Sequence, residues 1–324
     1  MAKILGLGNA LVDVMIMLPG DELLIETQIP KGSMQHVERN VIDHLLEKTN
    51  TLHQEITSGG SAANTIHGLA RLGHTTSFIG KIGSDHLGGI FHSDMIKSGI
   101  SPQLLISETD TGTAVAFISP DSERSFAVYL GAALELSAAD LNPGQFRGYD
   151  VLHIEGYLVQ NHQLIETAVQ LAKAAGMKVS LDLASYNVVE GHLDFLKSMV
   201  NKYVDIVFAN EEEALAFTGL EPEKAVSVLA KHCETAIVKT GAKGSLIMVN
   251  NKLCHTGILP TRVIDTTGAG DLYAAGFLHG MLSGMLVDNC GKAGALLAGN
   301  VIKHIGAKIP ANEWPGIIAE INNL

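Results

Sequence analysis

The second half of the chain alternates short apolar runs with longer segments of helical period, and this rhythm limits the folds open to it. The runs at residues 151–154, 177–182 and 204–209 are each followed by a helical pattern. Strands that are apolar on both faces need helices on both sides, which is typical of a parallel, doubly wound sheet. We therefore predict an α/β fold that binds ligands outside the carboxyl ends of its strands.

The first half of the chain carries a pattern typical of antiparallel strands. Residues 111–118 and 124–130 alternate in polarity on either side of PDSE at residues 120–123, which indicates a hairpin. Together with a stretch rich in proline and glycine, this hairpin predicts a small β-sheet that stands off the main one. We expect a single domain over residues 1–324, with a lid formed by segments at about 14–35 and 107–131.

Composition excludes several classes of protein. The 324 residues are 46% hydrophobic and 17% charged, which rules out intrinsic disorder. A net charge of −12 opposes binding to nucleic acid and to anionic membranes. The longest uncharged helical stretch near the end of the chain, residues 272–287, is shorter than the roughly 20 residues that span a bilayer. We expect no nucleic-acid partner and no membrane segment.

The cysteines and the N-terminal residues bear on location. The three cysteines are widely spaced and form no CxxC pair, which favours reduced thiols in a cytoplasmic protein. The apolar run over residues 1–18 is interrupted by Asp13, and no small-residue cleavage site follows it. We therefore interpret this run as strand of the mature protein and not as a signal peptide.

The strongest chemical signal is DTTGAGDLYAAGF at residues 265–277. Glycines permit tight or left-handed backbone, and a helix is predicted to begin at Asp271. The N–H groups of Gly268, Ala269, Gly270 and Asp271 would converge where the helix dipole favours a phosphate. Because a carboxylate repels phosphate, Asp271 is best explained as a base that takes a proton from an attacking hydroxyl. The alternative is that Asp271 only caps the helix.

A second signal is SGGSAANTIHGLARLG at residues 58–73. Two glycines precede Ser61, a candidate N-cap, and an apolar helix face follows. Asn64 lies one turn into this helix, so its amide can point back toward Gly59 and Gly60. The alternative is a glycine turn before an ordinary helix.

Two rival functions fit the sequence less well. The GLG at residues 6–8 suggests a dinucleotide-binding dehydrogenase, but Leu11 occupies the third glycine position of GxGxxG. Hydride transfer would also leave the motif at residues 265–271 unexplained. A non-catalytic sensor of small molecules on the same fold would not need the base that Asp271 supplies.

Together, the two glycine motifs resemble the signatures of the ribokinase or PfkB-type carbohydrate and nucleoside kinases. They occur in the order of that family, about 200 residues apart. The segments at residues 6–14, 210–219 and 239–245 also match, so the resemblance covers nearly the whole chain and is strongest to the adenosine kinase branch. It implies a Rossmann-like, doubly wound main sheet with a small β-sheet lid, and ATP-dependent phosphoryl transfer with Asp271 as the base. The anion hole would be formed by the amides of residues 268–271.

The resemblance also implies a substrate site. The positions that match the family's contacts to sugar hydroxyls are Asn9, Asp13, Gly60, Ser61 and Asn64. A carboxylate that accepts two vicinal hydroxyls suits a ribose-like substrate, although Asp13 could instead be a turn aspartate. Tyr157 matches an aromatic residue that packs against the nucleobase, and its alternative role is packing in the core.

On the nucleotide side, the resemblance covers two further segments. The residues that match the turn near the ATP phosphates or ribose are Lys239, Thr240, Gly241 and Gly244. Asn210 and Glu213 match an NxxE motif that is associated with Mg²⁺ and its water shell. The alternative for Glu213 is a helix cap that interacts with the dipole.

Three residues near the lid and the late glycine motif complete the expected site. Arg124 matches an arginine that reaches the transferring phosphate, and its alternative is an ion pair with Glu123 or Asp121. Asp265, with Thr267, lies where relatives bind a monovalent cation, so activation by K⁺ is one implication.

The expected substrate is neutral. The strand before residue 189 lacks the arginine of the DxNxR pattern of many sugar kinases, and no basic cluster is present to hold a second phosphate. We expect phosphorylation of a primary hydroxyl of an adenosine-like nucleoside, with a neutral sugar as the alternative substrate. The cofactors implied are ATP and Mg²⁺, in a monomer or homodimer. Asp182 and Asn187 receive no role.

Overall fold

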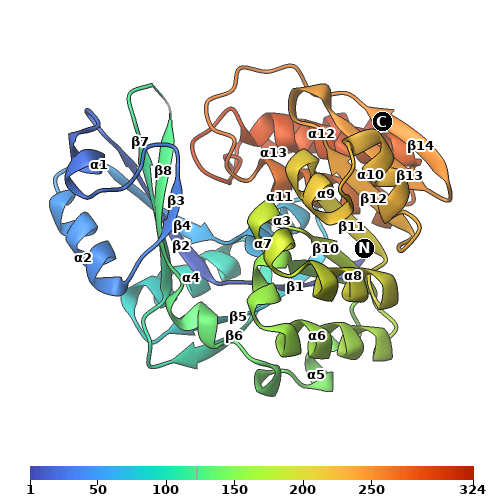
Figure 1. The fold of residues 1–324 in the computed structure, drawn as a ribbon, viewed down its shortest axis with the longest axis horizontal. Coiled ribbons are helices and arrows are strands. Elements are labelled where there is room, and N and C mark those ends of the chain that lie inside the picture. Colours follow the sequence, from blue (N-terminus) through green and yellow to red (C-terminus); the bar gives the residue numbers. More distant parts are fainter. Residues whose placement is uncertain (122) are drawn as a thin grey trace.

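A computed structural model describes residues 1–121 and 123–324 of the chain, which form two β-sheets and the helices that cover them (Figure 1). Ser122, in the predicted turn at residues 120–123, lies outside the described residues. The strands of the larger sheet are, in spatial order, β14 (Lys252–Thr256), β13 (Ser245–Val249), β12 (Thr235–Lys239), β11 (Ile206–Asn210), β10 (Lys178–Asp182), β9 (Val151–Glu155), β1 (Lys3–Leu7), β5 (Thr75–Gly83) and β6 (Ile100–Ser107).

The larger sheet is parallel from β6 to β12, and its last two strands run antiparallel. Strands β9, β10 and β11 lie where the apolar runs predicted them, within two residues at each end. The predicted α/β class and the mainly parallel, doubly wound sheet are confirmed. The carboxyl ends of β1, β9, β10, β11 and β12 therefore lie along one edge, where such sheets bind ligands.

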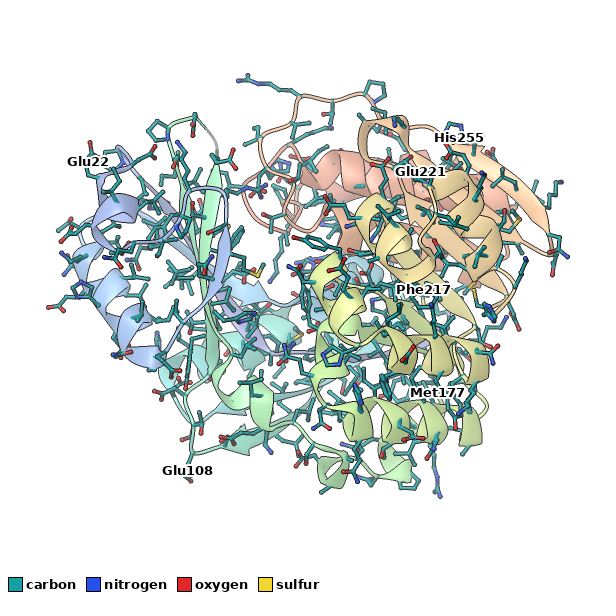
Figure 2. The ribbon with its side chains drawn as sticks, in the orientation of Figure 1. Glu22, Glu108, Met177, Phe217, Glu221 and His255 are labelled. Carbon is teal, nitrogen blue, oxygen red and sulfur yellow. The ribbon has the colours of Figure 1, made fainter. Side chains whose placement is uncertain are left out.

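Helices cover both faces of the larger sheet, and each face has its own apolar core. One face carries α3 (Ser61–Arg71), α4 (His86–Lys97), α11 (Ala269–Leu282), α12 (Val287–Val301) and α13 (Trp314–Asn322). The other carries α5 (Pro143–Phe146), α6 (His162–Ala174), α7 (Tyr186–Gly191), α8 (Leu193–Lys202), α9 (Glu211–Thr218) and α10 (Pro222–Leu229). Met177 and Phe217, labelled in Figure 2, belong to the second core and are nearly inaccessible to solvent.

The second sheet is small and stands apart from the first, as expected. Its strands are, in spatial order, β3 (Met34–His36), β8 (Arg124–Tyr129), β7 (Gly112–Ile118), β2 (Leu11–Met17) and β4 (Gln54–Gly59). The predicted hairpin is confirmed, since β7 and β8 pair antiparallel from Thr113–Tyr129 to Ile118–Arg124. Helices α1 (Glu22–Glu26) and α2 (Arg39–Lys48) lie on the face that points away from the larger sheet (Figure 1).

The sequence analysis did not assign β4 to the small sheet. Its residues alternate weakly in polarity, and it takes its place by pairing antiparallel with β2 from Leu11–Gly59 to Ile16–Gln54. The apolar run at residues 1–18 also divides between the sheets, because β1 belongs to the larger sheet and β2 to the smaller one. In the described residues, no helix is both long enough and apolar enough to cross a bilayer.

Candidate active site

A cavity of about 1160 Å³ lies between the two sheets, at the carboxyl edge of the larger one. Most of the residues predicted for the site line it, namely Asn9, Asp13, Gly60, Ser61, Asn64, Tyr157, Asn210, Glu213, Lys239, Gly241, Gly270 and Asp271. The predicted residues that do not line it are Arg124, Thr240, Gly244, Asp265, Gly268 and Ala269. Segments from the beginning, the middle and the last quarter of the chain thus line one cavity.

Two crossings between the sheets form the floor of this cavity. The chain leaves β1 and enters β2 through residues 8–10, and it leaves β4 and enters α3 at Gly60. Gly60 has φ +97°, and a Cβ atom there would lie 2.2 Å from the carbonyl oxygen of Asn9. Only glycine allows the two crossings to lie this close. Gly60 is also the N-cap of α3, so the prediction that Ser61 caps this helix is wrong.

Asp13 projects from β2 beside the second crossing. A Cβ atom on Gly59 would lie 2.3 Å from the Asp13 carboxylate, so the glycine makes room for this side chain. Burial raises the pKa of Asp13 to about 7, the positive charge of Lys308 opposes the rise, and the negative charge of Asp271 adds to it. Asp13 is therefore a strand residue with a perturbed carboxyl and not a turn aspartate.

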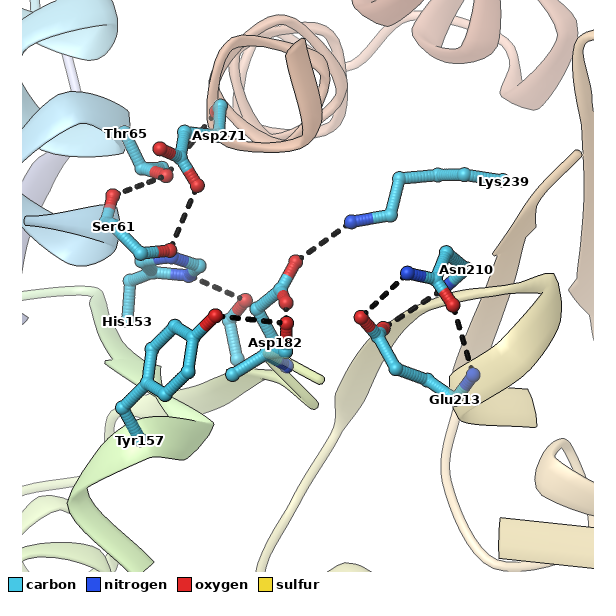
Figure 3. Close-up of polar contacts among 11 residues, drawn as sticks. Ser61, Thr65, His153, Tyr157, Asp182, Asn210, Glu213, Lys239 and Asp271 are labelled. Atoms are coloured by element: carbon cyan, nitrogen blue, oxygen red, sulfur yellow. Dashed lines mark hydrogen bonds and ion pairs between the residues drawn. The ribbon is translucent and has the colours of Figure 1, made fainter. Parts of the chain in front are cut away.

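Asp271 lies in the first turn of α11, beside the start of α3 (Figure 3). The hydroxyl of Ser61 donates to its Oδ1 at 2.7 Å, and Nδ2 of Asn64 donates to its Oδ2 at 2.9 Å. Burial is the largest cause that raises the pKa of Asp271 to about 6. Helix α11 begins at Ala269 with Gly268 as its N-cap, two residues earlier than predicted, so the alternative that Asp271 is the cap is wrong.

The start of α11 is built on two glycines. Gly268 has φ +72° and lies against Ala307, 2.5 Å from a notional Cβ atom, so both its conformation and its neighbour demand glycine. The N–H of Ala269 was expected to be one of the amides that bind phosphate. It donates instead to the carbonyl oxygen of Thr266 at 3.2 Å and closes a turn. Gly270 and Asp271, which supply the remaining amides of the first turn, line the cavity.

Lys239 forms an ion pair in the wall of the cavity. Its Nζ lies 2.9 Å from Oδ2 of Asp182, a residue to which the sequence analysis gave no role (Figure 3). Burial opposes the charge of Lys239, but Asp182 and Glu213 outweigh burial and raise its pKa. The amine also lies 3.0 Å from a notional Cβ atom on Gly270, which places a positive charge beside the start of α11.

The rest of the Lys239 turn supports this position. The N–H of Thr240 donates to the Gly244 carbonyl oxygen at 2.8 Å. Gly244 has φ +96°, and a Cβ atom there would lie 2.0 Å from the carbonyl oxygen of Thr256. The turn is therefore tight. Of its two glycines, Gly241 lines the cavity and Gly244 does not.

Asn210 and Glu213 hold each other at the start of α9. Nδ2 of Asn210 donates to Oε1 of Glu213 at 2.7 Å, and each residue's side chain also accepts the other's backbone N–H at 2.8 Å (Figure 3). This reciprocal pair is a capping box, as the alternative for Glu213 expected. Burial and the charge of Asp182 raise the pKa of Glu213 to about 7.

Arg124 reaches from β8 of the small sheet to the loop before α11. Its guanidinium contacts the Asp265 carboxylate and the Thr267 hydroxyl, and it donates to Oγ1 of Thr266 at 2.8 Å. The alternative that Arg124 pairs with Asp121 of the hairpin is wrong, because Asp121 forms an ion pair with Lys31 at 2.7 Å. The arginine therefore links the small sheet to the motif at residues 265–271.

Asp265 holds this loop in place. Its Oδ1 accepts from the N–H of Thr267 at 2.6 Å, and its Oδ2 accepts from the N–H of Gly306 at 2.7 Å. The guanidinium of Arg124 contacts the same carboxylate. Activation by K⁺ stays a prediction.

Comparison with known proteins supports the same assignment. The model of the pfkB family carbohydrate kinases matches residues 33–314. The chain belongs to this family. Its members are phosphotransferases that use ATP and act on hydroxyl groups, so this chain is a kinase with an alcohol group as acceptor. The predicted family resemblance is confirmed.

Both sugar kinases and adenosine kinases are among the pfkB relatives. The adenosine kinase from Sinorhizobium meliloti superposes with a TM-score of 0.88 at 34% identity, over 98% of this chain and 99% of that one. A probable sugar kinase from Rhizobium etli CFN 42 superposes with a TM-score of 0.89 at 32% identity, over 99% of each chain. Ribokinase from Haemophilus influenzae is 31% identical over 265 residues, which cover 78% of this chain and 84% of that one.

One residue of this kinase site was missed by the sequence analysis. Glu155, at the end of β9, is buried and accepts three hydrogen bonds. Its Oε1 accepts from the backbone N–H and Nδ2 of Asn9 at 3.0 and 2.7 Å, and its Oε2 accepts from the N–H of Ala62 at 2.9 Å. Burial raises its pKa to about 7. Glu155 therefore links the crossing between β1 and β2 to the crossing between β4 and α3. In the sequence, the only sign of this role is a single carboxylate within an apolar strand.

Proposed function

We propose that this kinase transfers the γ-phosphoryl group of ATP to a primary hydroxyl of an adenosine-like nucleoside. The observation that carries the proposal is the position of Asp271, a partly buried carboxylate with a pKa of about 6 at the start of a helix whose first residues line the cavity. A pKa near 6 leaves the carboxylate ionised at neutral pH, yet basic enough to take a proton as the hydroxyl attacks.

In the proposed reaction, the substrate hydroxyl donates a hydrogen bond to Asp271. As the oxygen–phosphorus bond forms, the proton passes to the carboxylate and the bond between the γ-phosphorus and the ADP oxygen breaks. Ser61 and Asn64 fix the carboxylate through its two oxygens, which leaves a lone pair on each oxygen, so that one of them can accept the substrate hydroxyl. The amides of Gly270 and Asp271, with Lys239 beside them, stabilise negative charge on the transferring group.

A divalent cation fits the other wall of the cavity. Glu213 and Asp182 bring two carboxylates close enough that the charge of Asp182 raises the pKa of Glu213. Mg²⁺ binds proteins through one or two carboxylates and several waters, together with substrate phosphates. We propose that Glu213 and Asp182 hold Mg²⁺ through its water shell. The bound ion would neutralise charge on the phosphates.

The lining of the cavity favours a nucleoside over a bare sugar. Asn9 and Asp13 offer an amide and a carboxylate to hydroxyl groups on one side. Beyond them the wall is apolar and offers a surface on which a planar base can pack; its residues are Met34, Ala114, Phe126, Val128, Leu130, Leu134 and Leu136. We propose that a purine lies against this wall, with Tyr157 at its edge. For Arg124 to contact the transferring phosphate from the small sheet, its guanidinium would have to leave Asp265.

A neutral sugar is the second candidate. The set formed by Asn9, Asp13 and Asn64 would bind the hydroxyls of ribose equally well, and ribokinase is among the relatives. With a sugar bound, the apolar residues of the wall would contact no part of the substrate.

Release of ADP from the purified protein across a panel of substrates tests the proposal. Adenosine, inosine, guanosine, ribose and fructose are compared at saturating MgATP, with and without K⁺. We expect kcat/KM for adenosine to exceed that for ribose by at least tenfold. A preference for ribose or fructose would overturn the nucleoside assignment, and the absence of ADP release with every substrate would overturn the proposed acceptor class.

A further inference from the structure

The apolar wall of the cavity has an end that lies away from the proposed sugar site. At this end the cavity adjoins a side pocket of about 300 Å³, and the residues that line both hollows are His36, Val128, Leu130, Leu134 and Gln160. Asn9, Asp13 and Asp271 line the cavity but not the side pocket. We call the part of the wall that adjoins the side pocket its far end.

His36 and Gln160 are the polar members of this shared set. Strand β3 pairs in parallel with β8, with Met34 opposite Phe126 and His36 opposite Val128. Met34 and His36 are two residues apart and therefore lie on the same face of β3. Since Met34 belongs to the apolar wall, His36 continues the row of Met34 to the far end.

Gln160 is placed by the 3₁₀ helix η3 (Gly156–Gln160), which follows β9. Residues three apart lie on the same side of a 3₁₀ helix, so Gln160 projects beside Tyr157, and both residues line the cavity. Leu158 and Val159, which lie between them in the chain, are buried in the second core. The proposed base site is thus flanked by Tyr157 and ends at Gln160.

The polar side chains that follow Gln160 in the chain are already engaged. Oδ1 of Asn161 accepts from the N–H of Leu164 at 3.0 Å and caps α6. Nε2 of His162 lies 3.0 Å from Nδ1 of His192. Gln160 itself is exposed, and within the part of the chain that the structure describes its amide forms no side-chain hydrogen bond. Its orientation is therefore not fixed by these neighbours.

We propose that Gln160 binds the edge of the purine opposite its sugar, and that the kinase accepts both 6-aminopurine and 6-oxopurine nucleosides. An amide carries two donors on nitrogen and an acceptor oxygen, and it can turn end over end. In one orientation its oxygen accepts from the amino group of adenine and its nitrogen donates to the neighbouring ring nitrogen. In the other, its nitrogen donates to the oxo group of hypoxanthine and its oxygen accepts from the ring N–H. This inference rests on the proposed function, in which a purine lies against the apolar wall.

The other groups at the far end do not impose one order of donors and acceptors. The imidazole of His36, when neutral, has one donor and one acceptor, which exchange with its tautomer. The carboxylate of Glu38, which would only accept, lines the side pocket and not the cavity. The far end thus offers two groups that adapt to the base, and neither selects between an amino and an oxo group.

The first test is the ranking of acceptors by the native protein at saturating MgATP. Because the amide of Gln160 can form two hydrogen bonds with either base, kcat/KM for adenosine and for inosine should agree within about tenfold. A site of fixed polarity leaves polar groups unpaired against the wrong base and separates the two by more. A ratio above about tenfold in either direction would overturn the proposal.

The second test reverses the polarity of the amide. Gln160→Glu presents two acceptors. Guanine offers two adjacent donors to such a group, whereas adenine offers one donor beside an acceptor. The ratio of kcat/KM for guanosine to that for adenosine should therefore rise about tenfold or more. Gln163→Glu, at an exposed position of α6 outside the cavity, is the matched control for the added charge and should leave the ratio unchanged. An unchanged ratio in Gln160→Glu would overturn the proposal.

The third test removes the hydrogen bonds and keeps the length of the side chain. Gln160→Met should lower kcat/KM for adenosine and inosine alike, by about fivefold to fiftyfold, with the KM for ATP unchanged. Thermal unfolding verifies that each variant folds. An equal fall with ribose would assign Gln160 a purely structural role. If the native protein phosphorylates neither nucleoside, the proposed function fails and this inference with it. If it phosphorylates adenosine and the Gln160 variants leave the ranking of bases unchanged, only this inference fails.

Discussion

Replacement of Asp271 by asparagine should stabilise the folded protein at neutral and alkaline pH, although it removes the proposed base. Burial raises the pKa of this carboxyl from 3.8 to about 6. Each pKa unit corresponds to about 1.4 kcal/mol, so the ionised carboxylate costs the folded state about 3 kcal/mol. Because the unfolded carboxyl ionises first as pH rises, this cost begins near pH 3.8 and is complete above pH 6. Asparagine keeps the shape of the side chain and carries no charge, and its Nδ2 can donate to the Ser61 hydroxyl, which can rotate to accept.

The assay is urea unfolding of the native protein and Asp271→Asn, followed by circular dichroism at several pH values. The gain in unfolding free energy should grow from about 1.5 kcal/mol at pH 5 to about 3 kcal/mol at pH 8. Asp288→Asn is the control, since Lys292 lowers the pKa of that exposed carboxyl and its loss should give no gain at high pH. A difference for Asp271→Asn that does not vary with pH, or a loss of stability at pH 8, would refute the reasoning.

Three further substitutions test other parts of the site. Asp13→Ala should raise the KM for the nucleoside much more than the KM for ATP in steady-state kinetics, and equal rises would count against its contact with hydroxyls. Glu155→Gln can keep both Asn9 hydrogen bonds but turns an N–H toward Ala62, so steady-state kinetics should show a raised nucleoside KM and an unchanged KM for ATP. Gly268→Ala should lower both stability and kcat, whereas Gly284→Ala, with φ +74° and open space around it, should cost only about 1 to 2 kcal/mol of stability. Similar losses of stability in both glycine variants would contradict the close packing at Gly268.

The architecture could be predicted from the sequence where the pattern is local. Apolar runs before helical periods located β9, β10 and β11, and the hairpin of β7 and β8 followed from alternation around a turn. The glycine motifs located the starts of α3 and α11 within two residues, because glycines at helix starts carry their own conformational signal.

The remaining features depend on contacts that no local pattern records. Glu155 meets Asn9 from 146 residues away, and Lys308 meets Ser58 from 250 residues away. A single carboxylate in an apolar strand and a single lysine near the end of the chain have no periodicity or spacing to mark them. Ser61 was expected to cap its own helix, but its hydroxyl instead donates to Asp271 of α11.

The most direct test of the account is the turnover number of Asp271→Asn with its preferred acceptor, measured beside the affinity for MgATP by calorimetry. If Asp271 accepts the proton of the hydroxyl, kcat should fall by about 10² to 10⁴ while the dissociation constant for MgATP changes by less than about threefold. Unchanged turnover at full MgATP affinity would show that the carboxylate at the start of α11 is not the base.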